Sequence, residues 1–131
     1  MSSRFAPTKI ASFAAAGLLV LSACGGGSST PSTTPADADV VVRAIDGISW
    51  NSKSYKATAT DGAVSIFGVN DSALAHNLYV LGDADKVIGT PIDLPERGSE
   101  GTVVLDLAPG SYRIVCKIPG HTNMDSTLTV S

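Results

Sequence analysis

Short β-branched runs separated by turn residues are the feature that most constrains the fold of this chain. Residues 38–131 carry no sustained helical periodicity, and turn signals such as Asp46-Gly47 interrupt the runs about every ten residues. Seven to eight short strands in one segment predict a single-domain, all-β Greek-key sandwich or small barrel. The run 87–94 contains Pro91, which cannot occupy a central ladder position, so this run is expected to be a broken strand. The expected strands cover residues 39–45, 54–60, 63–70, 76–81, 87–94, 101–107, 111–117 and 127–130.

Residues 1–23 have the pattern of a secretory leader. Arg4 and Lys9 make its beginning basic, and an apolar run of 12 residues follows at 10–21. A membrane-spanning helix needs roughly 20 apolar residues, so this run is too short to be one. The chain is therefore expected to be exported.

The leader ends in Leu-Ser-Ala-Cys-Gly at residues 21–25, which resembles the lipobox of bacterial lipoproteins. That resemblance implies a lipid on Cys24 and anchoring to the extracytoplasmic face of the cell membrane. The alternative is an ordinary signal peptide with a chance cysteine. Residues 24–37 are almost entirely Gly, Ser, Thr and Pro, a composition that predicts a flexible linker because it cannot bury an apolar core. The folded domain is thus expected at 38–131, which suffices for one small core.

Charge excludes nucleic acid as the expected partner. The full chain has 9 basic and 12 acidic side chains, and removal of Arg4 and Lys9 with the leader leaves 7 and 12, a net charge of −5. Binding to nucleic acid requires clustered lysines and arginines, and the remaining ones form no cluster in the sequence.

The residues of the domain with soft or borderline metal-donor atoms occur in two segments of the sequence. His76 lies in an expected strand, and Cys116, His121 and Met124 fall within nine residues. Two imidazoles, one thiolate and one thioether form a donor set that suits copper cycling between Cu(I) and Cu(II). If Cys24 is acylated, Cys116 has no cysteine to pair with, and on its own it is a free reactive thiol, a ligand or a buried inert cysteine. Taken singly, His76 would be a satisfied polar residue and Met124 a core filler, so the joint spacing carries the inference.

The expected strands explain how distant donors could meet. Alternation places Tyr112, Ile114 and Cys116 on one face of a strand, so Cys116 is expected at the inner end of that strand. Pro119-Gly120 is typical of a tight turn, which would fold His121 back towards Cys116.

The domain resembles the cupredoxins, the blue (type 1) copper proteins that include plastocyanin, azurin and amicyanin. His-Asn at 76–77, Tyr-Arg-Ile-Val-Cys-Lys-Ile-Pro-Gly-His at 112–121 and Met-Asp-Ser-Thr-Leu-Thr-Val at 124–130 carry the resemblance, which covers the whole expected domain. It implies a cupredoxin-like β-sandwich and one type 1 copper ion. The implied ligands are His76, Cys116, His121 and axial Met124.

The resemblance also implies roles for residues around the ligands. Asn77 would tie the two ligand segments together by a hydrogen bond, which orients the ligands. The spacing Cys-x4-His-x2-Met combines an azurin-like gap with an amicyanin-like one, and Ser126 stands where the family usually has glycine. If Met124 is not the axial ligand, the carbonyl of Ala75 or a water would take its place.

An electron carrier is the expected function. The exposed edge of His121 would be the electron port, and apolar neighbours at 74–75 and 118–119 would form the surface on which a redox partner protein docks. Alternatives with the same donors are copper delivery, sequestration or resistance, and zinc binding. An enzyme is not expected, because the chain has no oxyanion-hole motif beside Cys116 and has too few histidines for further copper clusters. The domain is expected to be monomeric.

Overall fold

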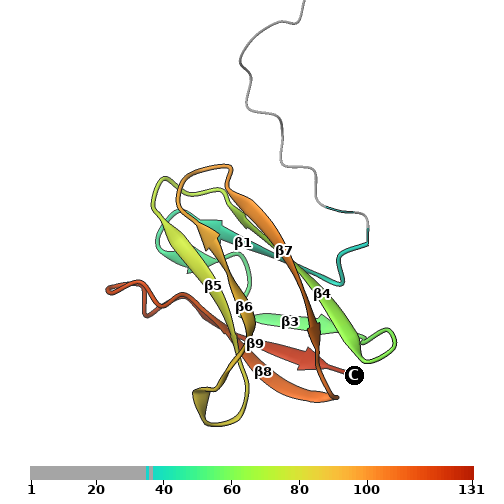
Figure 1. The fold of residues 1–131 in the computed structure, drawn as a ribbon. Coiled ribbons are helices and arrows are strands. Elements are labelled where there is room, and N and C mark those ends of the chain that lie inside the picture. Colours follow the sequence, from blue (N-terminus) through green and yellow to red (C-terminus); the bar gives the residue numbers. More distant parts are fainter. Residues whose placement is uncertain (1–34, 36) are drawn as a thin grey trace, which may run out of the picture.

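Residues 35 and 37–131, the part of the chain described in this computed structural model, form two β-sheets packed face to face (Figure 1). The predicted all-β, single-domain sandwich is confirmed. The described residues contain nine strands and one short 3-10 turn, η1, and no helix among them is long and apolar enough to cross a membrane. The elements are β1 (Val40–Ile45), β2 (Ser49–Trp50), β3 (Ser54–Ala57), β4 (Ala63–Asn70), β5 (His76–Leu81), η1 (Asp83–Asp85), β6 (Val87–Leu94), β7 (Glu100–Asp106), β8 (Gly110–Val115) and β9 (Asp125–Val130).

The predicted leader 1–23, its lipidated Cys24 and nearly all of the linker 24–37 lie outside the described residues. Export, lipidation and the domain boundary therefore stay predictions.

The chain crosses between the sheets repeatedly. One sheet has the order β2-β1-β4-β7, and the other has the order β3-β9-β8-β5-β6. Most neighbours are antiparallel, but β1 pairs with β4 and β3 pairs with β9 in parallel. After β2 the chain leaves the first sheet, and β3 pairs with β9 at the edge of the second sheet. Such connections tie the two layers together.

Alternating burial builds the core between the sheets. In β1 and β9 every second side chain is buried, as expected for strands with one face towards the core. Trp50 and Tyr55 are buried in the same core. Pro91 lies in β6, an edge strand of its sheet, so its exclusion from a central position is confirmed. The predicted break is wrong, because β6 is one strand over Val87–Leu94, and the irregularity is a register shift in its pairing with β5.

The strand boundaries differ from the prediction at several strands. β1 begins one residue later and β7 is offset by one residue, and β8 runs from Gly110 to Val115, so Cys116, predicted inside its strand, lies just beyond it. Sequence patterning missed the two-residue strand β2, which is too short to show alternation. β3 ends at Ala57, because the chain then turns into an isolated bridge between Thr60 and Ala63. β9 begins two residues early, at Asp125, because its antiparallel pairing with β8 extends to the Val115–Asp125 pair.

Candidate metal centre

Antiparallel pairing of β5 with β8 brings the predicted donors to one end of the sandwich. Tyr79 pairs with Val115, so the beginning of β5 and the end of β8 lie side by side at the same end of the sandwich. His76 is the first residue of β5, and Cys116 directly follows β8. His121 lies in the loop that leads from β8 to β9.

The three donor side chains meet in a small buried group. The Nδ1 atoms of His76 and His121 are 3.2 Å apart, and the Cys116 Sγ lies 3.6 Å from the Nδ1 of His121. All three donor atoms lie within 4.8 Å of one another. The residues are 2%, 8% and 9% exposed for His76, Cys116 and His121, so bulk water has little access to the group.

Two of the three separations among these atoms match bonds to one metal ion, and the third pair, Cys116 and His76, lies within 4.8 Å. In zinc sites, metal–nitrogen bonds are about 2.0 Å and metal–sulfur bonds about 2.3 Å. With those lengths, the 3.2 Å nitrogen separation corresponds to an angle of about 106° at the ion, and the 3.6 Å sulfur–nitrogen separation corresponds to about 113°. Both angles suit tetrahedral or trigonal coordination. A thiolate with two imidazoles suits copper in particular.

A tight turn holds His121 in place. The backbone N–H of His121 donates to the carbonyl of Ile118 over 3.1 Å, which closes a four-residue turn. Pro119 occupies its second position, and Gly120 has φ +88° at the third, as a type II turn requires. The turn predicted at Pro119-Gly120 is therefore confirmed, and it directs His121 back towards Cys116.

Met124 is fully buried beside the same group, with 1% exposure. Its carbonyl accepts the N–H of Cys116 over 3.0 Å, and its N–H donates to the carbonyl of His121 over 3.0 Å. These bonds place its backbone next to two of the three donors, but ligation by its sulfur stays a prediction. Ala75, the alternative source of an oxygen ligand, is an exposed residue directly before His76, and its ligation likewise stays a prediction.

The predicted contact of Asn77 is present. Its Oδ1 accepts the backbone N–H of Lys117 over 2.7 Å. Asn77 directly follows His76 and Lys117 directly follows Cys116, so this bond ties the two donor segments together.

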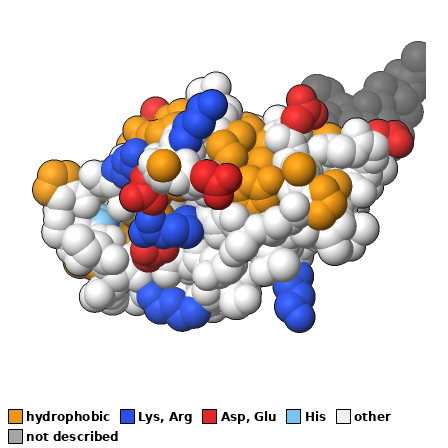
Figure 2. Space-filling view, turned by 90° about the horizontal axis from the view of Figure 1, so that it is seen from below, with side chains coloured by type: hydrophobic (Ala, Val, Ile, Leu, Met, Phe, Trp, Pro, Cys, Tyr) orange, Lys and Arg blue, Asp and Glu red, His pale blue; other side chains and the backbone are white. Residues whose placement is uncertain are grey.

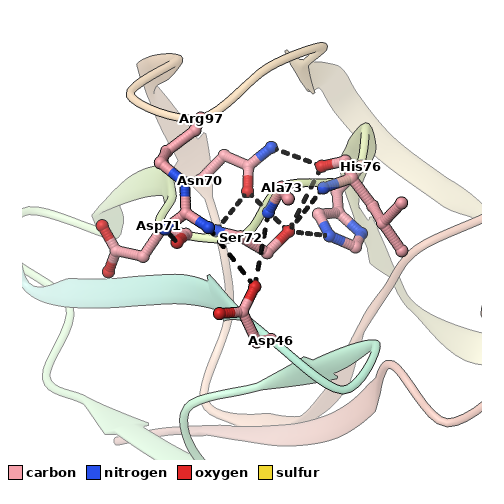
Figure 3. A network of polar contacts seen from close by, with 8 residues as sticks. Asp46, Asn70, Asp71, Ser72, Ala73, His76 and Arg97 are labelled. Carbon is pink, nitrogen blue, oxygen red and sulfur yellow. Dashed lines mark hydrogen bonds and ion pairs between the residues drawn. The ribbon is translucent and has the colours of Figure 1, made fainter.

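Sequence reasoning missed the support behind His76. The Ser72 hydroxyl lies 2.6 Å from the His76 Nε2, and it also donates to the Oδ1 of Asn70 over 3.0 Å (Figure 3). Both supporting residues are buried. In the sequence, Asn70-Asp71-Ser72 has the composition of a turn and nothing more specific. One sequence signal points to this support: a serine lies four residues before the candidate ligand His76. It lies in a loop whose polar groups need hydrogen-bond partners.

Electrostatics favour the metal-binding form of His76. Its burial, and then the charge of His121, lower the pKa of His76 below its usual value. His76 therefore stays neutral at neutral pH, which is the form that binds metals.

The group comes close to the surface on the His121 side. Figure 2 shows histidine atoms reaching the surface at one end of the molecule, with a hydrophobic side chain outermost at that end. Leu74, in the loop before His76, is 49% exposed, and Pro119 is also exposed. The surface beside the donor group is thus partly apolar.

No family model and no curated protein matches the sequence. Solved structures do match. Dithionite-reduced auracyanin from Roseiflexus castenholzii has a TM-score of 0.60 and 18% identity over 70% of this chain and 95% of its own. Auracyanin B has a TM-score of 0.57 and 24% identity over 81% and 96%, and reduced rusticyanin has 0.58 and 16% over 72% and 81%. At these identities the likeness establishes the fold, and all three proteins are cupredoxins. The chain therefore has the cupredoxin fold, and its His76, Cys116 and His121 form a group that fits a blue copper site.

Proposed function

We propose that the domain binds one copper ion and carries one electron at a time between protein partners. The observation that carries this proposal is the convergence of His76 Nδ1, Cys116 Sγ and His121 Nδ1 within 4.8 Å in a cupredoxin fold. In the proposed site these three atoms would be the principal ligands, and Met124 would contribute a weakly bound sulfur. When bound, copper supplies a Cu(I)/Cu(II) couple suited to one-electron transfer.

The chain's own residues would keep this site nearly unchanged during electron transfer. The type II turn fixes His121, and the Asn77–Lys117 hydrogen bond joins the two donor segments. Burial of the three donors limits access of water as a competing ligand. A donor set held in this way needs little rearrangement when the charge on the ion changes, and a small rearrangement favours rapid transfer.

The apolar surface near His121 would be the docking surface. Leu74 and Pro119 are exposed there, Ala75 is exposed between Leu74 and His76, and Ile118 is partly buried. Small, transient contacts are typical of electron-transfer complexes. Similar structures were determined for reduced auracyanin, reduced rusticyanin and an oxidised amicyanin variant, so members of this fold are known in both oxidation states. This supports a redox role for the proposed site.

We further propose that the carrier is exported and tethered at Cys24 by a lipid to the extracytoplasmic face of the membrane. The linker 24–37 would then let the domain reach its redox partners near the membrane surface. Mass spectrometry of the mature chain tests this proposal. It should begin at Cys24 with an attached lipid, and an unmodified mature chain beginning elsewhere would contradict the anchor.

Voltammetry of the copper-loaded protein tests the proposed carrier. We expect one copper ion per chain and a reversible one-electron wave, both lost in Cys116→Ser, in which oxygen replaces the sulfur without a change of shape. Copper bound without a reversible wave, and exchanged rapidly with a chelator, would support delivery instead. Preferential retention of zinc from a mixture of copper and zinc would contradict the assignment of the metal.

A further inference from the structure

We infer that Ser72 is a positioning residue for the metal centre, which holds His76 in the tautomer that presents Nδ1 to a metal. This inference rests on the proposed function, because it concerns the same site. The Ser72 hydroxyl lies 2.6 Å from the His76 Nε2, on the side of the ring away from His121 and Cys116. Both residues are 2% exposed, so water does not replace this contact easily.

Asn70 fixes the direction of the hydrogen bonds around Ser72. The two N–H groups of its side-chain amide donate to the carbonyls of Leu74 over 2.7 Å and of Leu94 over 3.0 Å. With both donors used, the Oδ1 of Asn70 must face the other way, where it accepts the backbone N–H of Ser72 over 2.9 Å. Asn70 is fully buried, so this orientation is held on every side.

The hydroxyl of Ser72 has two oxygen acceptors besides the ring of His76. A hydroxyl has one hydrogen to donate and two lone pairs to accept with. Its hydrogen is within reach of the Oδ1 of Asn70 over 3.0 Å and of the carbonyl of Leu74 over 3.2 Å, and one lone pair accepts the N–H of Leu74 over 3.2 Å. With the hydrogen donated to either oxygen, the remaining lone pair is available to the Nε2 of His76. In the arrangement that we infer, His76 carries its proton on Nε2, and the lone pair of Nδ1 faces His121 and Cys116.

A second set of contacts holds the loop that carries Ser72. Asp46 accepts the backbone N–H of Ala73 over 3.3 Å and forms an ion pair with Arg97, which in turn donates to the carbonyl of Asp71 (Figure 3). These contacts join three loops at the metal end of the sandwich: the turn after β1, the loop before β5 and the loop after β6. The loop is thus held on both sides of Ser72.

The consequence for a bound metal has a definite sign. An acceptor behind the ring fixes the tautomer and makes the metal-binding nitrogen more basic. A more basic nitrogen favours Cu(II) over Cu(I). Loss of the Ser72 hydroxyl should therefore weaken binding of Cu(II) more than binding of Cu(I), and raise the reduction potential.

The test compares Ser72→Ala with the matched variant Ser126→Ala in the full chain. Ser126 is also a buried serine, and its hydroxyl donates over 2.6 Å to the carbonyl of Ser52 rather than to a metal donor. We expect copper affinity to fall about 10- to 100-fold in Ser72→Ala, and to change little in Ser126→Ala. If binding of Cu(II) falls about tenfold further than binding of Cu(I), the potential rises by about 59 mV. Ser72→Thr, which keeps the hydroxyl, should restore most of the affinity.

Nitrogen NMR of His76 in the metal-free protein gives a readout that needs no copper. We expect a proton on Nε2 in the wild-type chain, exchanging slowly with water, and faster exchange in Ser72→Ala. Because the wild-type spectrum is informative alone, this arm remains decisive if the alanine variant does not fold.

Two results would overturn the inference. One is a wild-type His76 protonated on Nδ1 in the metal-free protein. The other is a Ser72→Ala variant with wild-type copper affinity and potential. If the wild-type chain takes up no copper at all, the proposed function fails instead, and the NMR result on His76 is unaffected.

Discussion

Replacing Gly120 by alanine should loosen the metal centre through the backbone alone. Gly120 has φ +88°, and a Cβ built at this position meets no atom within 4 Å. The left-handed conformation costs a residue with a side chain about 1–2 kcal/mol. Alanine also reduces the entropy of the unfolded chain, which returns about 0.4–1 kcal/mol. The expected net loss of unfolding free energy is therefore about 1 kcal/mol.

The same strain should reach the ligand. The turn can relax only by moving Gly120 towards negative φ, and this would shift His121, the next residue. A penalty of about 1 kcal/mol on the metal-bound geometry corresponds to roughly fivefold weaker copper binding. Copper titration of the variant measures that change directly.

Gly62→Ala is the matched control. Gly62 also has positive φ (+79°) and open space around it, but it lies at the other end of β4 from Asn70. The eight residues of β4 span roughly 25 Å at about 3.3 Å each, so this turn is far from the donor group. Gly62→Ala should lose similar stability without a change in copper affinity. Equal copper affinities in Gly120→Ala and Gly62→Ala would refute the reasoning that the turn positions His121.

Three further outcomes follow from burial and linkage. Leu128 is fully buried in β9, so Leu128→Ala should lower the free energy of unfolding, measured by urea denaturation, by about 2–5 kcal/mol. Thr127 is its exposed neighbour, and Thr127→Ala should change that free energy by no more than about 0.5 kcal/mol. Similar losses in both variants would contradict the assignment of Leu128 to the core. Burial, and then the charge of His121, lower the pKa of His76 in the folded state. On acidification, His76 therefore binds a proton in the unfolded chain at a higher pH than in the folded protein. The stability of the metal-free protein should accordingly fall as the pH drops below about 6.5. A urea midpoint that rises on acidification through that range would contradict this sign. Free copper at about 100 times its dissociation constant should add about 2.7 kcal/mol of stability in a thermal melt, and Cys116→Ser should abolish most of that gain; an undiminished gain in the variant would place the copper elsewhere.

The fold was largely predictable because its pattern is local. The runs Ala63–Asn70 and His76–Leu81 have the predicted bounds, since β-branched and apolar residues between turn residues identify a strand. Strand β2 was not predictable, because two residues carry no period. The parallel pairing of β3 with β9 also has no local signal, as it joins segments more than seventy residues apart.

The candidate site was predictable to the level of its donors and no further. His76, Cys116 and His121 stand out because few other residue types bind soft metals, and the structure brings their donor atoms together. The support from Ser72 and Asn70 was missed because serine and asparagine are common in turns. Their role depends on the orientation of buried hydrogen bonds, which the sequence does not encode in any short spacing.

The visible spectrum of the copper(II)-loaded chain tests the central claim most directly. If Cys116, His76 and His121 hold copper as proposed, the protein should absorb intensely in the visible region through thiolate-to-copper charge transfer. The band should disappear in Cys116→Ser, while the fold, followed by far-ultraviolet circular dichroism, is retained. A protein that binds one Cu(II) per chain and remains colourless would contradict the account.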